Sequence, residues 1–309
     1  MESTPGPSSS LQSAIQQFLT YLVARNLSQN TIRAYRRDLA QLVNSVAANA
    51  TASDVDRNAV RSFLVKLHQD GIGRSSVYRK LEAIKSFYRW ADNEGISFDG
   101  RILNLSTPRE RDKLPNVPSE KEMERLLDGK ILTACPERDR VILELLYGSG
   151  LRASELAGVN LADFKYKDAL LIRGKGKKER MVPLTEPTQI AVEAWLPIRE
   201  QLLIKFTLKT DALLFSVGPL RSLERLDVRS IHRIVRGVAM AKGLRNYHPH
   251  MLRHACGTHL HDHDVPLLAI ARLLGHSKLA TTQIYTRVST GRMLDVYLKA
   301  HPHARKSGF

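Results

Sequence analysis

A break in the apolar pattern at residues 96–118, a stretch rich in Gly, Pro, Arg and Asp, constrains the fold more than any other feature. No helical or strand period is sustained across it, whereas amphipathic stripes lie on both sides. The chain has 309 residues, which is long enough for two ordinary domains. We therefore expect two domains joined by a linker at residues 96–118, after a disordered tail at residues 1–10 that has no apolar periodicity.

The segment before the break predicts a small all-α domain at residues 11–95. Its apolar residues fall on one helical face in four stretches, at residues 11–22, 32–46, 60–67 and 81–91. Ser28, Asn30 and either Ser75 or Ser76 are candidate N-caps, and Gly71 and Gly95 are candidate helix ends. We expect four main helices in this domain.

The segment after the break, residues 119–303, predicts a mixed α+β domain within a mainly α protein. Ser119 and Glu122 have the spacing of a capping box, and Gly275 suits a helix end. Helical stripes lie at residues 141–147, 190–203 and 228–239, with Pro249 and Pro266 in two further first turns. Residues 169–172 and 181–184 predict a small antiparallel sheet around a basic hairpin, and a tail helix is expected at about 290–300.

The charge balance predicts a polyanionic partner. Lys and Arg number 47 against 31 Asp and Glu, a net charge of +16 with a pI near 10.0. Residues 1–107 carry 13 basic and 9 acidic residues, so the remaining 34 basic and 22 acidic residues hold most of the excess. Double-stranded DNA is the expected partner and an anionic membrane surface the alternative.

The location expected from the sequence is the cytoplasm. The sequence has no apolar run near 18 residues and no signal-peptide core, so we expect a soluble cytoplasmic protein. Cys135 and Cys256 lie far apart and outside any CxxC motif, so both are expected to be reduced and structural.

Two basic motifs in the second domain suit phosphate binding. Arg152 follows a glycine turn at Gly150, where a helix start can present its guanidinium to a phosphate. Lys175 stands between two glycines, which let the backbone approach a ligand closely. The alternatives are a surface arginine paired to Glu155 and a solvated turn that grips the DNA backbone nonspecifically.

The remaining candidates are His250 and Arg253, three residues apart on one helix face, and then His276 and Tyr285. A histidine beside an arginine suits proton transfer near a phosphate, with a capping histidine and a structural arginine as the alternative. A metal site is a further alternative, because four histidines crowd one segment, at His254, His259, His261 and His263. No HExxH motif or cysteine partner joins them, so no metal is expected.

Together these residues supply what phosphodiester transesterification needs. Tyr285 is the candidate nucleophile, and Arg152 and Arg253 can neutralise the phosphate and its five-coordinate state. Lys175 can protonate the leaving 5′ oxygen, His250 can take the tyrosine proton, and His276 can hydrogen-bond the phosphate. With this many cations, no cofactor is required.

The same blocks resemble the active-site motifs of the tyrosine site-specific recombinases. The sequences GLRASELAGV, IRGKGKKERMVPL, HPHMLRHACGTHL and LLGHSKLATTQIYT carry the ordered Arg, Lys, His-x-x-Arg, His and Tyr of that family. SQNTIRAYRRDLAQL and SVYRKLEAIKSFYRWA resemble the amino-terminal core-binding domain of the XerC and XerD type. The motif HPHMLRH and the closing AHPHA lean slightly toward XerC.

The resemblance implies an enzyme that joins Tyr285 to a DNA 3′ phosphate and exchanges strands through a Holliday junction, without metal or ATP. It implies a homo- or heterotetramer on DNA with a second Xer-type recombinase, controlled by a septal DNA translocase. The implied task is resolution of chromosome dimers at a dif-like site in a bacterial nucleoid. In such proteins the tail helix docks on a neighbouring protomer, while the alternative is packing on its own domain.

Direct DNA contacts in the first domain are expected from Arg79 and Lys85, on the fourth predicted helix. Three other functions remain open. A type IB topoisomerase uses a similar tyrosine and arginine set, a phage or integron integrase shares the family, and a DNA-binding regulator would carry an inactive site. All six candidate catalytic residues are present, which disfavours the regulator.

Overall fold

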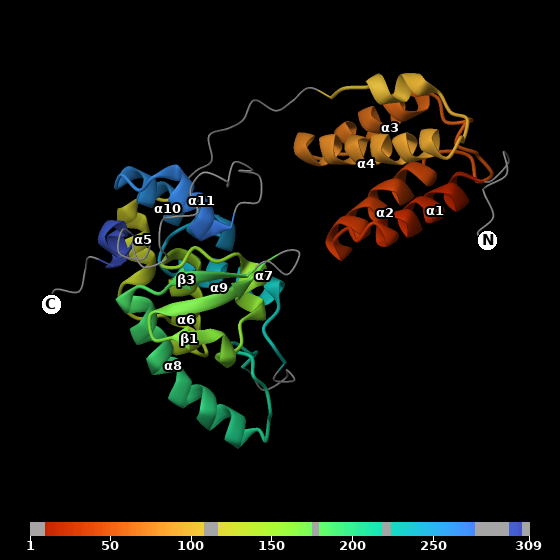
Figure 1. Ribbon diagram of the computed structural model, residues 1–309. Helices are drawn as coiled ribbons and strands as arrows, with labels where there is room; N and C mark the ends of the chain where they lie inside the picture. The colour runs from red at the N-terminus through yellow and green to blue at the C-terminus, as the bar shows by residue number, and fades with distance from the viewer. Residues whose placement is uncertain (1–9, 108–116, 175–178, 218–223, 276–296, 305–309) are drawn as a thin grey trace. The chain divides into compact units, whose positions relative to one another are not determined.

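The computed structural model describes residues 10–107, 117–174, 179–217, 224–275 and 297–304 (Figure 1). The chain divides into two compact units, Met1–Pro115 and Asn116–Phe309. Each unit has its own hydrophobic core. The prediction of a mainly α protein, with an all-α first part and a small antiparallel sheet in the second, is confirmed.

The first unit consists of four helices around an aromatic core. The helices are α1 Leu11–Ala24, α2 Gln29–Val43, α3 Arg57–Gln69 and α4 Arg74–Asn93. The Phe18 ring lies 5.8 Å from that of Phe87, edge to face, and 5.7 Å from that of Trp90. All three rings are buried, and such pairs add to the free energy that burial alone contributes.

The predicted helix caps and helix ends of the first unit are confirmed in part. Ser28 caps α2 by accepting a hydrogen bond from the Thr31 backbone N–H, as predicted, whereas the candidate cap Asn30 is wrong because it lies inside α2. Gly71 and Gly95 follow α3 and α4 with φ of 76° and 72°, in the left-handed region that favours glycine. The prediction of a serine cap on α4 is wrong, because α4 begins at Arg74 after Gly73, without a side-chain cap.

The start of the expected linker packs with the first unit. A short 3-10 helix, η1 Gly100–Asn104, follows α4. Ile102 and Leu105 are buried in the first core, and the two units separate only at Pro115 and Asn116. Two apolar residues three apart are too few to establish a period, so the pattern alone indicated a linker from residue 96.

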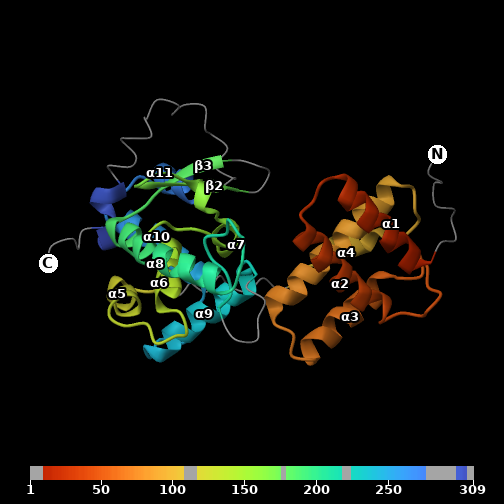
Figure 2. The ribbon, with the colours of Figure 1, turned by 90° about the horizontal axis from the view of Figure 1, so that it is seen from below.

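The second unit combines a group of packed helices with a three-stranded sheet that lies at one side of them (Figure 2). The helices are α5 Glu120–Leu127, α6 Pro136–Tyr147, α7 Ala153–Gly158, α8 Glu186–Lys205, α9 Val228–Ala241, α10 Pro249–Asp262 and α11 Leu267–Leu274, with 3-10 turns η2 Leu161–Asp163 and η4 Pro302–Ala304. The sheet has the antiparallel order β1 Phe164–Tyr166, β2 Ala169–Arg173 and β3 Glu179–Pro183. Strand β1 has only three residues, which is too short to show an alternating pattern.

Helix α6 is the centre of the second core and contacts α8, α9 and α10. It begins at Pro136 with two acidic residues in its first turn, which favours a helix start. Beyond that turn it is apolar almost all round, as expected for a helix packed on every side. Among the helices that the structure describes, none combines the length and apolar character that crossing a bilayer requires.

The described part of the tail packs on its own domain. Tyr297 and His301 are buried, and His301 Nε2 lies 3.3 Å from the backbone oxygen of Tyr147. His303 Nε2 lies 2.8 Å from Glu144 Oε2, on α6. Tyr297 and Ala300 of the expected tail helix thus pack on their own domain, while residues 290–296 lie outside the described residues.

Burial of His301 predicts a loss of stability on mild acidification. Burial lowers the pKa of His301 from its ordinary 6.5 to about 3. Below pH 6.5 the His301 imidazole therefore binds a proton in the unfolded chain but stays neutral in the folded state. Lowering the pH from 7 to 5 should cost the second unit about 2 kcal/mol of unfolding free energy from this residue.

Urea unfolding followed by Trp195 fluorescence, in a Trp90→Phe background, reports on the second unit alone. His301→Gln should remove about 2 kcal/mol of the pH dependence. The control His261→Gln, at an exposed histidine, should keep that dependence. An unchanged pH dependence in His301→Gln contradicts the prediction.

Candidate active site

A tight turn between α6 and α7 positions Arg152. Gly150 in this turn has φ of 61°, and a Cβ there would meet Leu274 Cδ2 at 2.6 Å, so the turn requires glycine. Arg152 is the N-cap of α7, and its backbone N–H donates to Glu155 Oε2 at 2.9 Å. Its guanidinium donates to Glu155 Oε1 at 2.8 Å and to the backbone oxygen of Gly275 at 3.0 Å. The predicted glycine turn and helix start are both present.

Arg253 lies beside Arg152 but is held differently. It projects from α10 and is 3% exposed. Its Nη1 donates to the backbone oxygen of Gly150 at 2.6 Å, and its Nη2 donates to that of Leu274. Burial, and next the charge of Arg152, lower its pKa to about 10, so it remains a cation at neutral pH. Carbonyl groups therefore orient the guanidinium without cancelling its charge.

His250 lies one turn before Arg253 on α10, whose first residue is Pro249. Partial burial lowers its pKa below 6.5, and the positive charges of Arg253 and Arg152 act in the same direction. The imidazole is therefore neutral at pH 7 in the free protein. A neutral imidazole can accept a proton, which is the property that a general base needs.

Two further residues, Glu155 and Arg180, lie beside these side chains. Neither of them was predicted from the sequence to have a catalytic role. Glu155 is buried, and Arg180 donates from Nη1 and Nη2 to its two carboxylate oxygens, each at 2.9 Å. Burial raises the pKa of Glu155, but hydrogen bonds from Arg180 and from the Arg152 backbone outweigh it and lower the pKa to about 2. Arg180 also donates from Nε to the backbone oxygen of Leu273 at 2.9 Å.

One sequence signal could have identified Arg180. Side chains two residues apart on a strand share a face, so Arg180 lies on the same face of β3 as the buried Val182. A cation on a buried strand face requires an internal partner. The basic character of the surrounding hairpin obscured this signal, because five of its residues at 173–180 are Lys or Arg.

The cluster therefore gathers three guanidiniums around one carboxylate, from Arg152, Arg180 and Arg253 with Glu155. The third ion pair is looser, with Arg253 Nη1 3.8 Å from Glu155 Oε2. The net charge of these four groups is +2, and the Arg152 side chain is 39% exposed. A site of this charge, with one guanidinium open to solvent, is suited to bind a phosphate.

Three of the six candidate catalytic residues lie outside the described residues, namely Lys175, His276 and Tyr285. The structure describes residues that adjoin two of them, His276 and Lys175. Gly275, which precedes His276, ends α11 with φ of 64° and accepts the hydrogen bond from Arg152. Strands β2 and β3 flank the hairpin that contains Lys175.

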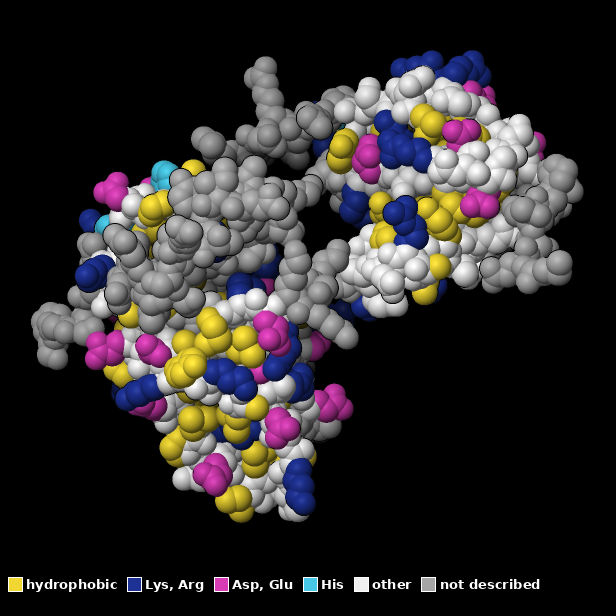
Figure 3. Space-filling model, viewed as in Figure 1, with side chains coloured by type: hydrophobic (Ala, Val, Ile, Leu, Met, Phe, Trp, Pro, Cys, Tyr) yellow, Lys and Arg dark blue, Asp and Glu magenta, His cyan; other side chains and the backbone are white. Residues whose placement is uncertain are grey.

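The candidate DNA-binding residues of the first unit have local acidic partners. Arg79 pairs with the buried Asp38, and its side chain is 39% exposed. Lys85 lies 3.9 Å from Glu82 and is mostly covered. Figure 3 shows Lys and Arg interspersed with Asp and Glu on the visible face of this unit. Arg79 and Lys85 therefore stay predictions.

Two of the clustered histidines have structural roles. His259 Nδ1 lies 3.0 Å from the Tyr147 hydroxyl, and its Nε2 lies 2.9 Å from the backbone oxygen of Pro118. His263 Nε2 lies 2.8 Å from Glu120 Oε1. Within the described ranges, no group of three or more His, Cys, Asp or Glu has an arrangement suited to a metal ion.

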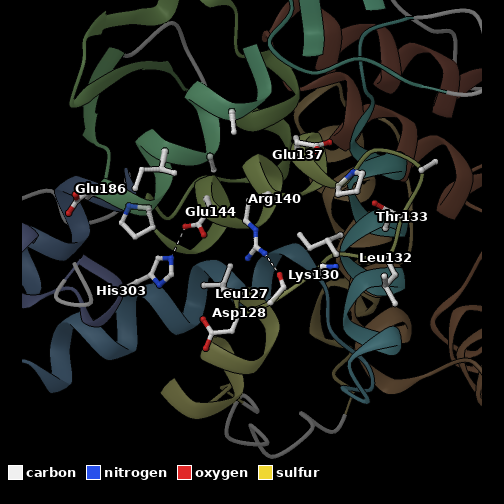
Figure 4. Close-up of a pocket in the computed structure, with 18 residues that line it drawn as sticks. Leu127, Asp128, Lys130, Leu132, Thr133, Glu137, Arg140, Glu144, Glu186 and His303 are labelled. Carbon is white, nitrogen blue, oxygen red and sulfur yellow. Dashed lines mark hydrogen bonds and ion pairs between the residues drawn. The ribbon is translucent and has the colours of Figure 1, made fainter. Parts of the chain in front are cut away.

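A cavity of about 1320 Å³ lies elsewhere in the second unit, with residues of α6 and α8 in its wall (Figure 4). Arg140 in its wall donates to the backbone oxygen of Gly129 at 2.5 Å, and His303 contacts Glu144. None of the candidate catalytic residues that the structure describes lines this cavity. The cation cluster is therefore a separate feature.

Comparison with known proteins identifies the class. Residues 117–292 match the phage integrase family, and residues 15–95 match the phage integrase N-terminal SAM-like domain. The chain belongs to the phage integrase family. It is a tyrosine recombinase, an enzyme that cleaves and rejoins DNA.

Its relatives include recombinases of both Xer types. It is 36% identical to tyrosine recombinase XerC of Pseudomonas aeruginosa, over 96% of this chain and 97% of that protein. It is 34% identical to tyrosine recombinase XerD of Oceanobacillus iheyensis, over 95% of this chain and all of that protein. The structure of XerH bound to difH substrate before cleavage has the same fold, with a TM-score of 0.67, 21% identity and coverage of 95% and 96% of the two chains.

The electrostatic surroundings of His250 predict its titration in the free enzyme. Because burial and neighbouring cations disfavour the imidazolium, the midpoint should lie below the ordinary 6.5. Proton NMR of the histidine ring resonances measures this, with His250→Gln assigning the signal by its disappearance. A midpoint at or above 6.5 contradicts the described geometry.

Proposed function

We propose that the cation cluster is the phosphate site of the recombinase and that Tyr285 is its nucleophile. The convergence of Arg152 and Arg253 on the chain at Leu274–Gly275 carries this proposal. Arg152 offers an exposed guanidinium, and Arg253 offers a buried one fixed by two backbone oxygens. Two cations of fixed direction suit the nonbridging oxygens of one phosphodiester.

Catalysis proceeds by in-line attack of the Tyr285 oxygen on phosphorus. The tyrosine–phosphorus bond forms as the bond to the 5′ oxygen breaks, which leaves a 3′-phosphotyrosyl linkage and a free 5′ hydroxyl. Arg152 and Arg253 stabilise the extra negative charge of the five-coordinate state. The linkage conserves the energy of the phosphodiester, so rejoining needs no ATP.

Proton transfer is assigned to the remaining residues. His250, neutral at pH 7 in the free protein, takes the phenol proton. Lys175 protonates the leaving 5′ oxygen, and His276 donates a hydrogen bond to the phosphate. The family resemblance of the motifs around Lys175 and His276 supports these two roles.

The biological task proposed is resolution of chromosome dimers at a dif-like site. The XerC and XerD relatives cover nearly the whole chain, and a recombinase of the same fold was crystallised on difH substrate. Exchange of one strand pair produces a Holliday junction, and exchange of the second pair resolves it. The assembly is a tetramer on two sites with a second Xer-type recombinase, activated by a septal DNA translocase.

Covalent capture tests the nucleophile. On a nicked suicide duplex, where the released fragment diffuses away, the wild-type protein should accumulate a denaturant-stable protein–DNA adduct. Tyr285→Phe should form none, because it lacks the attacking oxygen. The control Tyr297→Phe keeps the ring of a buried tyrosine and should retain adduct formation. An adduct with Tyr285→Phe contradicts the assignment.

Removal of the Arg152 guanidinium should lower the rate of the chemical step more than it lowers the affinity for DNA. Arg152→Gln should reduce adduct formation at saturating DNA about a hundredfold, equivalent to about 3 kcal/mol. DNA affinity should change little, because the chain retains most of its 47 basic residues. Single-turnover kinetics with fluorescence anisotropy separate the two effects, and an unchanged rate contradicts this role of Arg152.

Sequencing of captured genomic DNA tests the biological task. A dif-specific enzyme should be attached at one chromosomal locus with two inverted half-sites. Attachment dispersed over many unrelated sequences contradicts that task. In a parallel assay, efficient relaxation of a supercoiled plasmid lacking the captured site would favour a topoisomerase.

A further inference from the structure

We propose that Arg180 is a positioning residue that holds the two phosphate-binding arginines in their active arrangement by occupying the carboxylate of Glu155. This inference rests on the proposed roles of Arg152 and Arg253. Arg180 comes from β3, whereas Arg152 precedes α7 and Arg253 lies on α10. It therefore acts from a third element of the domain.

The hydrogen bonds of Arg180 connect separate parts of the site. Its two terminal nitrogens each lie 2.9 Å from one oxygen of Glu155, a bidentate geometry that lysine cannot reproduce. Its Nε donates to the backbone oxygen of Leu273, near the end of α11. Arg180 thus joins β3 to α7 and α11, and it does so with an 85% covered side chain.

Glycine at position 275 allows Arg180 to approach the end of α11. A Cβ on Gly275 would lie 3.0 Å from Arg180 Nη1 and 3.1 Å from its Cζ. The backbone oxygen of the same glycine accepts the hydrogen bond from Arg152. Arg180 therefore packs closely against the residue whose backbone oxygen Arg152 contacts, and it bonds to the backbone two residues earlier, at Leu273.

The occupied carboxylate matters because Glu155 has two further cations within reach. Arg152 already bonds to Oε1, whereas Arg253 Nη1 is 3.8 Å from Oε2 and bonds instead to backbone oxygens. Without Arg180, the buried carboxylate would lose its bidentate partner and keep only Arg152, which donates to Oε1 from its guanidinium and to Oε2 from its backbone N–H. A buried anion with fewer partners is costly. Arg253 is the nearest replacement, and turning to Glu155 would move its charge away from the phosphate.

A matched arginine exists on the neighbouring strand. Arg173 on β2 also forms two ion pairs, with Asp163 at 2.6 Å and Glu179 at 3.2 Å. Its side chain is half exposed, and neither partner belongs to the cation cluster. Arg173→Gln therefore removes the same charge from the same sheet without altering the surroundings of Glu155.

The test measures adduct formation on the nicked duplex at saturating DNA, together with DNA affinity. Arg180→Gln should lower the rate at least tenfold and change affinity less than twofold, whereas Arg173→Gln should leave the rate within twofold of wild type. Arg180→Lys should recover only part of the loss, because one ammonium cannot bridge both oxygens. Wild-type rates in Arg180→Gln would overturn the proposal.

A double variant separates positioning from general destabilisation. If Arg180 acts through Glu155, then Glu155→Gln in the Arg180→Gln background removes the charge that attracts Arg253 and should raise the rate at least threefold. Glu155→Gln is also measured alone, and a double variant whose loss of rate relative to wild type equals the product of the two single losses would overturn the proposal. Trp195 fluorescence in the Trp90→Phe background verifies that each variant remains folded at the assay temperature.

The controls distinguish this inference from the proposed function. Tyr285→Phe and Arg152→Gln are measured in the same assay. If both abolish or strongly slow adduct formation while Arg180→Gln does not, only the role of Arg180 is wrong. If Arg152→Gln is as active as wild type, the phosphate site itself is wrong, whatever the result for Arg180.

Discussion

The candidate site depends on the ion pairs that the buried carboxylate of Glu155 makes with arginines. Its two oxygens receive both terminal nitrogens of Arg180, and Oε1 also receives Arg152. These cations would repel one another if no anion lay between them. The carboxylate remains ionised, with a pKa of about 2, so it balances one charge and leaves an excess for a phosphate. Backbone oxygens hold Arg253, which keeps its charge available.

The frame around this carboxylate explains why the fold places an anion site here. Helix α6 is packed on all sides, and the turn at Gly150 carries the chain directly from it to Arg152. Helix α10 presents Arg253 to that turn, and α11 ends beside it at Gly275. The guanidiniums are therefore oriented without a ligand, and such preorganisation is what the proposed phosphate site requires. The Arg152 guanidinium is the partly exposed one.

Local rules in the sequence predict the fold class and the helix ends around the candidate site. The motifs also nominate Arg152, His250 and Arg253, whose catalytic roles stay predictions. The Ser119 capping box, the Pro249 helix start and the left-handed Gly275 each depend on a few adjacent residues, and all three are present. Arg180 depends instead on contacts 25 and 93 residues away, which a basic hairpin motif does not reveal. The same limit applies to His259, whose two partners come from residues far along the chain. Sequence patterns predict helices and strands, whereas ion pairs between residues far apart in the chain become visible only in the three-dimensional structure.

The central claim is that Arg152 and Arg253 bind the same phosphate to which Tyr285 becomes esterified. A crystal structure of the covalent adduct, trapped on a nicked duplex, tests it most directly. We expect the Tyr285 oxygen bonded to phosphorus, with donors from both guanidiniums about 2.9 Å from its nonbridging oxygens. A phosphotyrosine whose nonbridging oxygens contact neither guanidinium would contradict it.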